Sequence, residues 1–339
     1  MRKVLFFILA SVFLTAQKTE MIDFSKSIKD DNKSIKSFHV IDIRTSKELG
    51  SVMHHQDQID IVFKNNATED LSNWFYKYNK EKGSKDLILL LEDLHVSEDR
   101  KEKYSIGKAG VRASTFLKRD DGYHFLYRKD TIATVSSRDT PYMSQSLTKK
   151  IALVFTDLIK KSYNASPWEY TITENELKDY STLLKDHLEI LKINQLKDGV
   201  YKDYYSFFTH NPEPGFILET NNKGVVTKAV NGNEKKPIRN FYAFVYNGVP
   251  FKVIPVGYVE IFRDELGLFI EVKKEELFPE SNSSFIIGGG LIGGLVGGLA
   301  VVAVDAIAAK KRKEMKGSEV SLDPFTGNYI LPVNFGKYK

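Results

Sequence analysis

The sequence predicts an α+β fold in two modules, with helices on an antiparallel sheet first, then a small antiparallel sheet domain, and finally a glycine-zipper helix. Three observations predict it: mixed strand and helix patterns over residues 22–164, closely spaced aromatic strands over 197–280, and a glycine-rich apolar run at 285–309. The remaining boundaries are a signal peptide at 1–17, a linking helix at 165–196, and a basic cluster with a C-terminal strand at 310–339.

The chain begins with an export signal. Residues 1–17, MRKVLFFILASVFLTAQ, place Arg2 and Lys3 before an apolar run and end near Ala16, a small residue where a signal peptidase could cut. The apolar run is shorter than the roughly 20 residues that a spanning helix needs. We therefore expect an exported protein of the periplasm or cell envelope, with a membrane anchor left open.

Composition excludes several kinds of site. The chain has no cysteine, so it has no disulfide, no thiolate metal site and no lipobox for lipid attachment. The formal net charge is +5, and the basic residues are scattered apart from 310–313. Nucleic acid is therefore not an expected partner.

The first module, 22–164, reads as strand, helix, meander and helix. Residues 38–45 form a compact β-rich run, and a helix is expected to open at Thr68 and to stop at Gly83. Further strands follow with Asp121-Gly122 as a hairpin turn, and an apolar stripe from Leu147 to Leu158 predicts the second helix. This order favours helices packed on one antiparallel sheet.

The second half begins with a capping-box pattern, Thr173 with Glu176, which predicts one helix continuing to Leu191. Strands follow, beginning with GVYKDYYSFF at 199–208. Asn221-Asn222 and Asn247-Gly248 are the expected turns between later strands.

One stretch carries a family resemblance. LKDGVYKDYYSFFTHNPEP resembles a motif of uncharacterised secreted proteins of Bacteroidota, with matching positions Asp198, Gly199, Val200, Tyr201, Tyr204, Phe207, Asn211 and Pro212. In that group an aromatic strand, a glycine-rich apolar segment and a short final strand follow, an order that matches roughly the last 140 residues here. The resemblance implies no activity. From the residues themselves, Asp198, Tyr201 and Asn211 are best interpreted as turn and packing residues.

The first module is also similar, in element order and in the opening VIDIRT, to auxiliary envelope components of ABC transporters. Those proteins are usually lipoproteins, whereas this chain has no lipobox.

No catalytic, cofactor or metal site is predicted. There are seven histidines, and the adjacent His54 and His55 lack carboxylate partners at ligand spacing. The G-x-S-x-G, H-E-x-x-H and phosphate-loop signatures are absent. The sequence gives no reason to predict an enzyme, although a triad built from scattered residues stays open.

The glycine run is the sharpest signal. Two series spaced by four residues give a smooth helical face, which Asp305 shares; the glycines are Gly289, Gly290, Gly293, Gly294, Gly297 and Gly298. The 25 residues 285–309 contain one charge, follow an acidic stretch and precede KKRK, so they are long enough to span a membrane with the basic end inside. The strand expected in the tail leaves a second possibility. If it joins the sheet domain, the segment must be a hairpin or packed insertion, with sheet and tail on one side.

Two functions therefore remain. The first is a non-enzymatic cell-envelope protein that binds or scaffolds an unidentified envelope partner and is tethered to a membrane, or self-associates, through the glycine zipper. The alternative is a soluble periplasmic ligand-binding protein or enzyme in which the glycine segment packs internally.

Overall fold

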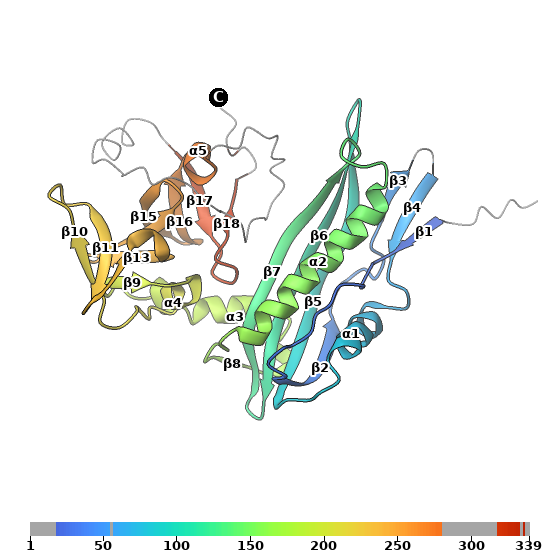
Figure 1. The fold of residues 1–339 in the computed structure, drawn as a ribbon, viewed down its shortest axis with the longest axis horizontal. Helices are drawn as coiled ribbons and strands as arrows, with labels where there is room; N and C mark the ends of the chain where they lie inside the picture. The colour runs from blue at the N-terminus through green and yellow to red at the C-terminus, as the bar shows by residue number, and fades with distance from the viewer. Residues whose placement is uncertain (1–17, 55–56, 280–316, 333–334, 336–339) are drawn as a thin grey trace, which may run out of the picture.

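The computed structural model describes residues 18–54, 57–279, 317–332 and 335, and it confirms the predicted α+β class. Figure 1 shows a module with a long sheet and a long helix beside a second module built of shorter strands.

The first module contains a five-stranded sheet in the order β2-β5-β6-β7-β8. Strand β2 pairs with β5 in parallel, and every other neighbouring pair in this sheet is antiparallel. The strands are β2 (Ile35–Asp42), β5 (Lys85–Arg100), β6 (Ser105–Arg119), β7 (Gly122–Ser136) and β8 (Thr171–Ile172). Strands β1 (Lys18–Met21), β3 (Ser51–His54) and β4 (Asp57–Val62) form a small separate sheet in the order β1-β4-β3.

Two helices pack with one face of the long sheet in a common core: α1 (Ala67–Tyr78) and α2 (Met143–Asn164). The Asn66 side chain caps α1 by accepting a hydrogen bond from the backbone N–H of Glu69. The helix ends at Tyr78, so the predicted stop at Gly83 is wrong. Gly83 instead lies against the backbone of Ser34, where a Cβ atom would have no room.

The linking segment is divided. After β8 come a 3₁₀ turn (Glu174–Glu176), α3 (Tyr180–Asp186) and a second 3₁₀ turn (Glu189–Leu191), in place of the one helix predicted. The capping box of Thr173 and Glu176 does form. Leu188 then takes an extended conformation, and both Leu188 and Ile190 are buried, so burial of these side chains outweighs helix continuity.

The second module has a seven-stranded sheet in the order β18-β17-β16-β15-β14-β13-β9, with every pairing antiparallel. Its strands are β9 (Gly199–Tyr201), β13 (Ala243–Tyr246), β14 (Val249–Ile254), β15 (Gly257–Asp264), β16 (Gly267–Val272), β17 (Ser318–Leu322) and β18 (Tyr329–Ile330). A smaller sheet consists of β10 (Ile217–Thr220), β11 (Val226–Asn231) and β12 (Glu234–Pro237), followed by a 3₁₀ turn (Ile238–Asn240).

The strand predicted over 199–208 is only partly present. It stops after three residues at Tyr201, and α4 (Tyr204–Phe208) follows. The Asp203 carboxylate accepts a hydrogen bond from the backbone N–H of Ser206 at 2.7 Å and so starts a helix inside an aromatic pattern that suits a strand.

The tail joins the second module. Strand β17 pairs with β16, and Ser318 lies opposite Val272. A short helix, α5 (Lys274–Leu277), precedes the part of the chain that is not described. The chain between β16 and β17 is therefore an insertion between neighbouring strands, which is the second of the two arrangements that the sequence allows.

Several predicted features lie outside the described residues: the signal peptide, His55, the glycine run with Asp305, and the basic cluster at 310–313. Among the helices of the described ranges, none is both long and apolar enough to cross a membrane.

The two modules share a hydrophobic core. The face of the long sheet away from α2 contributes Ile88, Leu90 and Phe125, and these pack in one cluster with residues of the linking segment and of the second sheet. Phe325 of the tail contacts Phe125 and Trp168, with ring centroids 5.6 and 5.7 Å apart. The modules are therefore held by apolar packing as well as by the linking segment.

Candidate functional site

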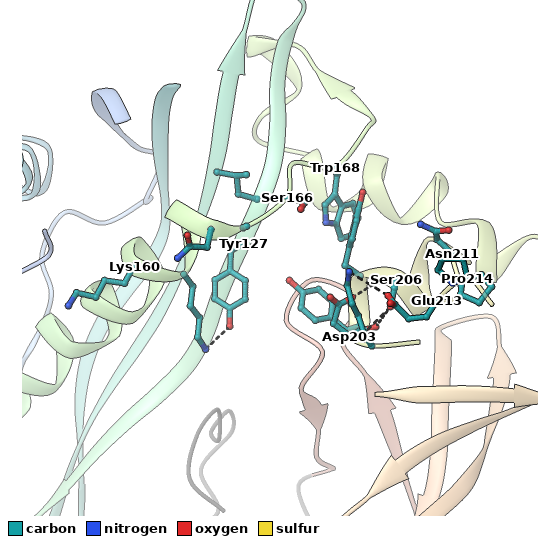
Figure 2. Close-up of a pocket in the computed structure, with 17 residues that line it drawn as sticks. Tyr127, Lys160, Ser166, Trp168, Asp203, Ser206, Asn211, Glu213 and Pro214 are labelled. Carbon is teal, nitrogen blue, oxygen red and sulfur yellow. Dashed lines mark hydrogen bonds and ion pairs between the residues drawn. The ribbon is translucent and has the colours of Figure 1, made fainter. Parts of the chain in front are cut away.

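A cleft of about 1040 Å³ lies where the modules meet. One wall comes from β7 and the C-terminal end of α2, and the other from residues 202–206 and 211–214. Residues 165–168 of the linking segment join the two walls (Figure 2).

The α2 wall presents lysines beside a tyrosine. Lys161 donates a hydrogen bond to the Tyr127 hydroxyl at 3.2 Å and lies 3.3 Å from the Asp157 carboxylate. Burial alone would lower the pKa of Lys161, but the Tyr127 oxygen and the Asp157 charge raise it above its ordinary value. Lys160, one residue earlier, is exposed on the same wall.

The opposite wall is fixed by hydrogen bonds within the second module. Asp203 caps α4, and the Asn211 backbone N–H donates to the Ser206 carbonyl at 2.8 Å. The Glu213 carboxylate lies 3.5 Å from Lys202. These contacts give this wall a defined shape in the absence of any ligand.

Aromatic rings line the cleft. Trp168 is buried and packs against Tyr205, with ring centroids 5.3 Å apart. Burial raises the pKa of both Tyr204 and Tyr205 above the ordinary range, so both hydroxyls stay protonated at neutral pH.

The family-motif residues divide between this cleft and the fold. Tyr204, Asn211 and Pro212 line the cleft. Val200, Tyr201 and Phe207 are fully buried core residues.

The first two motif residues shape the backbone nearby. The Asp198 carboxylate accepts hydrogen bonds from the backbone N–H groups of Asn247 (2.9 Å) and Gly248 (2.8 Å). Both turn residues have positive φ, 54° and 76°, so Asp198 stabilises the tight β13–β14 turn. Gly199 has φ of 145°, and a Cβ atom there would lie 3.1 Å from Pro212.

A buried lysine lies in the second module, on β14. The Lys252 ammonium donates to the carbonyls of Tyr242 (3.1 Å) and Val253 (2.7 Å), and its nitrogen lies 4.0 Å from the Tyr242 ring centroid. Burial lowers its pKa to about 7. Sequence reasoning missed this residue, although Lys252 has the same strand parity as the buried Ile254.

Sequence reasoning also missed a buried polar cluster between the modules. The Ser114 hydroxyl donates to the Glu92 carboxylate at 2.6 Å, and the Tyr180 hydroxyl donates to the same oxygen at 3.0 Å. Arg128 lies 3.8 Å from Glu92 and against the ring of Phe325. Ser114 and Tyr180 are fully enclosed, so this cluster joins the modules and offers no entry for a substrate.

The histidines in the described part of the chain do not gather at one site. His54 lies on β3, His124 is buried against Asp121 (3.0 Å) and the Trp168 carbonyl (2.9 Å), and His95 pairs with Asp93 at an exposed position. Within the described ranges, no three residues of histidine, aspartate, glutamate or cysteine are placed to hold a metal ion.

Comparison with known proteins gives little. No family model matches the chain, and no curated protein matches it. Among solved structures, a hypothetical protein, CT253 from Chlamydia trachomatis, is similar over 38% of this chain and 94% of its own, with 12% sequence identity and a TM-score of 0.19. A likeness at this level supports no argument about fold or function.

Proposed function

We propose that this protein is a non-enzymatic component of a cell envelope. It is exported by residues 1–17, binds a partner in the cleft between its modules, and contacts a membrane or a second copy through residues 285–309. The partner is an envelope molecule that both modules recognise together.

The observation that carries this proposal is the composition of the cleft. It combines aromatic rings, exposed lysine and amide groups on two walls that are held together by a shared core. Clefts at the boundary between modules are common binding sites, and the polar and charged side chains among the rings of this cleft suit a partner that offers both polar and apolar groups.

The ionisable groups of the cleft favour binding over acid–base catalysis. The carboxylates of Asp203 and Glu213 are each engaged in a contact that shapes the wall. The pKa values of Lys161, Tyr204 and Tyr205 are all shifted upward, away from neutral pH. A general acid or base works best with a pKa near the operating pH.

Position-specific crosslinking tests the cleft. Because the chain has no cysteine, Lys160→Cys introduces a single thiol that can carry a photo-crosslinker. Lys149→Cys is the matched control, since Lys149 is exposed on the same helix but away from the cleft. With envelope extract of the producing cells, we expect a defined product from position 160 and none from position 149. Equal labelling at both positions, or none at either, would contradict the proposal.

The insertion point sets the topology of the attachment. Since β16 and β17 pair directly, the inserted segment must enter and leave the membrane on the same side, so a single crossing is incompatible with the paired tail. We expect the full chain to stay with membranes after an alkaline wash. A tag after Lys339 should be accessible from the side that carries the modules.

A variant that replaces residues 285–309 by a Gly-Ser linker of equal length is the control for the attachment. It keeps the β16–β17 connection but removes the apolar segment, and we expect it in the soluble fraction. Wild-type protein that is equally soluble would refute the attachment through this segment.

A further inference from the structure

The outer face of the seven-stranded sheet is covered on one half only. Near β13 and β14 it packs against β11 and its neighbours in a third core that includes Phe244, Val226 and Ala229. On the other half, four side chains lie in register across β15, β16, β17 and β18; this outer row is Phe262, Phe269, Ser321 and Ile330.

Three of the four side chains of the outer row are apolar, and in the described part of the chain the row is open. Phe262 is 38% exposed and Ile330 is 56% exposed, and the rings of Phe262 and Phe269 stack with centroids 5.6 Å apart. Ser321 is also exposed between them and Ile330. Exposed apolar rows of this kind on neighbouring strands favour a covering partner.

An acidic pair lies beside the outer row. Glu271 and Glu319 are directly opposite each other on the same face of β16 and β17, and both are exposed. Like charges placed opposite each other on a sheet disfavour the pairing, so a cationic partner here would stabilise it.

The chain that leaves and re-enters the sheet at this place contains an apolar segment followed by a basic cluster. It leaves the described structure after α5 and returns at β17, and Phe269 is only three residues, about 10 Å, from Val272 at the insertion point. The apolar run 285–309 is joined to these ends by connections of seven and eight residues, each able to reach about 20 Å. In the sequence the basic cluster 310–313 ends five residues before Ser318, and Ser318 is the neighbour of Glu319 on β17.

We propose that residues 285–309 dock on the outer row of their own chain when no membrane is present, with the basic cluster 310–313 beside Glu271 and Glu319. A covalently joined segment has a high effective concentration at this face and excludes competing partners. Glycine would allow its backbone close to the rings of Phe262 and Phe269. If a lipid surface covered the same face instead, Glu271 and Glu319 would lie against its headgroups.

This inference goes beyond the proposed function, because it concerns purified protein in the absence of a membrane. Its test is therefore independent of whether the chain binds a membrane or fills its cleft.

Ser321→Cys places a thiol in the centre of the outer row with little change in size, and Ser97→Cys, exposed on β5, is the matched control. We would attach benzophenone maleimide to purified full-length protein without vesicles, irradiate it and map the products by mass spectrometry. The expected product is an intramolecular crosslink from position 321 to residues 285–309, with none from position 97. A dimeric product would overturn the proposal in favour of a second copy, and no product would overturn it in favour of an uncovered face.

A rate measurement gives a second readout. If the segment covers the row for about 90% of the time, a water-soluble thiol reagent should label the Ser321→Cys protein about tenfold more slowly than the same substitution in the Gly-Ser linker variant. Equal rates in the two proteins would overturn the proposal. Slow labelling that is seen only when vesicles of neutral phospholipid are added to the linker variant would also overturn the proposal. In that case the face binds lipid and not the segment.

Discussion

Lys252 makes the free energy of unfolding of this protein depend on pH between about pH 7 and pH 10.5, a range in which few groups titrate. The ammonium is buried, and its contacts are two carbonyl oxygens and two tyrosine rings. We consider Lys252→Met, which keeps much of the length of the side chain and removes the charge.

The sign of this pH dependence follows from the number of protons that the folded and the unfolded chain bind. Burial lowers the folded-state pKa of Lys252 to about 7, against 10.5 for the ordinary group. Between these values the unfolded chain holds a proton that the folded chain lacks, so the free energy of unfolding falls as the pH drops and rises with pH. Each pKa unit is worth about 1.4 kcal/mol, so the wild type should gain about 5 kcal/mol from this group between pH 7 and pH 10.5. Below pH 7 both states are protonated and the full cost of burying the charge remains.

The Lys252→Met variant lacks this dependence but also loses two hydrogen bonds, at a cost of about 1 kcal/mol each. At pH 7 we therefore expect the variant to be more stable than the wild type by about 3 kcal/mol, and the difference should fall by about 3 kcal/mol when the pH rises to 9.5.

Urea denaturation of both proteins at several pH values between 7 and 9.5 measures this difference. The range stops there because burial raises the pKa of Tyr201 and Tyr329, and these groups lower stability as the pH rises above about 10. A difference that stays constant across the range, or a wild type that loses stability between pH 7 and 9.5, would refute the reasoning.

Three further substitutions test parts of the fold by urea denaturation. Asp198→Ala removes the acceptor for two N–H groups of the β13–β14 turn and should cost about 1–3 kcal/mol, with Asp198→Asn in between; an unchanged midpoint would count against this role. Gly50→Ala should cost about 2–4 kcal/mol, because φ is +103° and the new Cβ would meet the Val96 carbonyl. Gly232→Ala, with φ of +57° and open space around the new Cβ, should cost only about 1–2 kcal/mol. Equal costs for the two variants would refute the steric argument. Phe325→Ala should cost about 3–5 kcal/mol by opening the core between the modules, against less than about 1 kcal/mol for Leu266→Ala at an exposed position. Similar losses would show that the shared core contributes little.

Periodicity predicted the larger elements because their burial is one-sided. The stripe through Leu147 and Leu158 became α2, and the alternation around Ile261 and Ile270 became paired strands with one buried face. These patterns depend only on which face of each element meets a core.

The misplaced boundaries come from side-chain hydrogen bonds that compete with periodicity. Asp203 starts a helix within a run of rings that suits a strand, and Asn79 ends α1 before Gly83 is reached. Gly83 is a glycine because Ser34 approaches it closely, a contact between segments that no local pattern contains.

The cleft was beyond sequence reasoning for a related reason. Tyr127, Trp168 and Tyr205 are separated by tens of residues, and they meet only because the linking segment folds back on the long sheet. The motif residues Asn211 and Pro212 lie in one wall, but they were interpreted as turn and packing residues, and the motif gave no sign that α2 supplies the other wall.

Hydrogen exchange of the full-length protein, with and without envelope extract of the producing cells, tests the binding cleft most directly. The account predicts slower exchange on both walls at once, in peptides that cover residues 158–168 and 203–214, while peptides of the β10–β12 sheet stay unchanged. Exchange that is unaltered on both walls, or slowed only outside them, would contradict the claim that the two modules bind a partner between them.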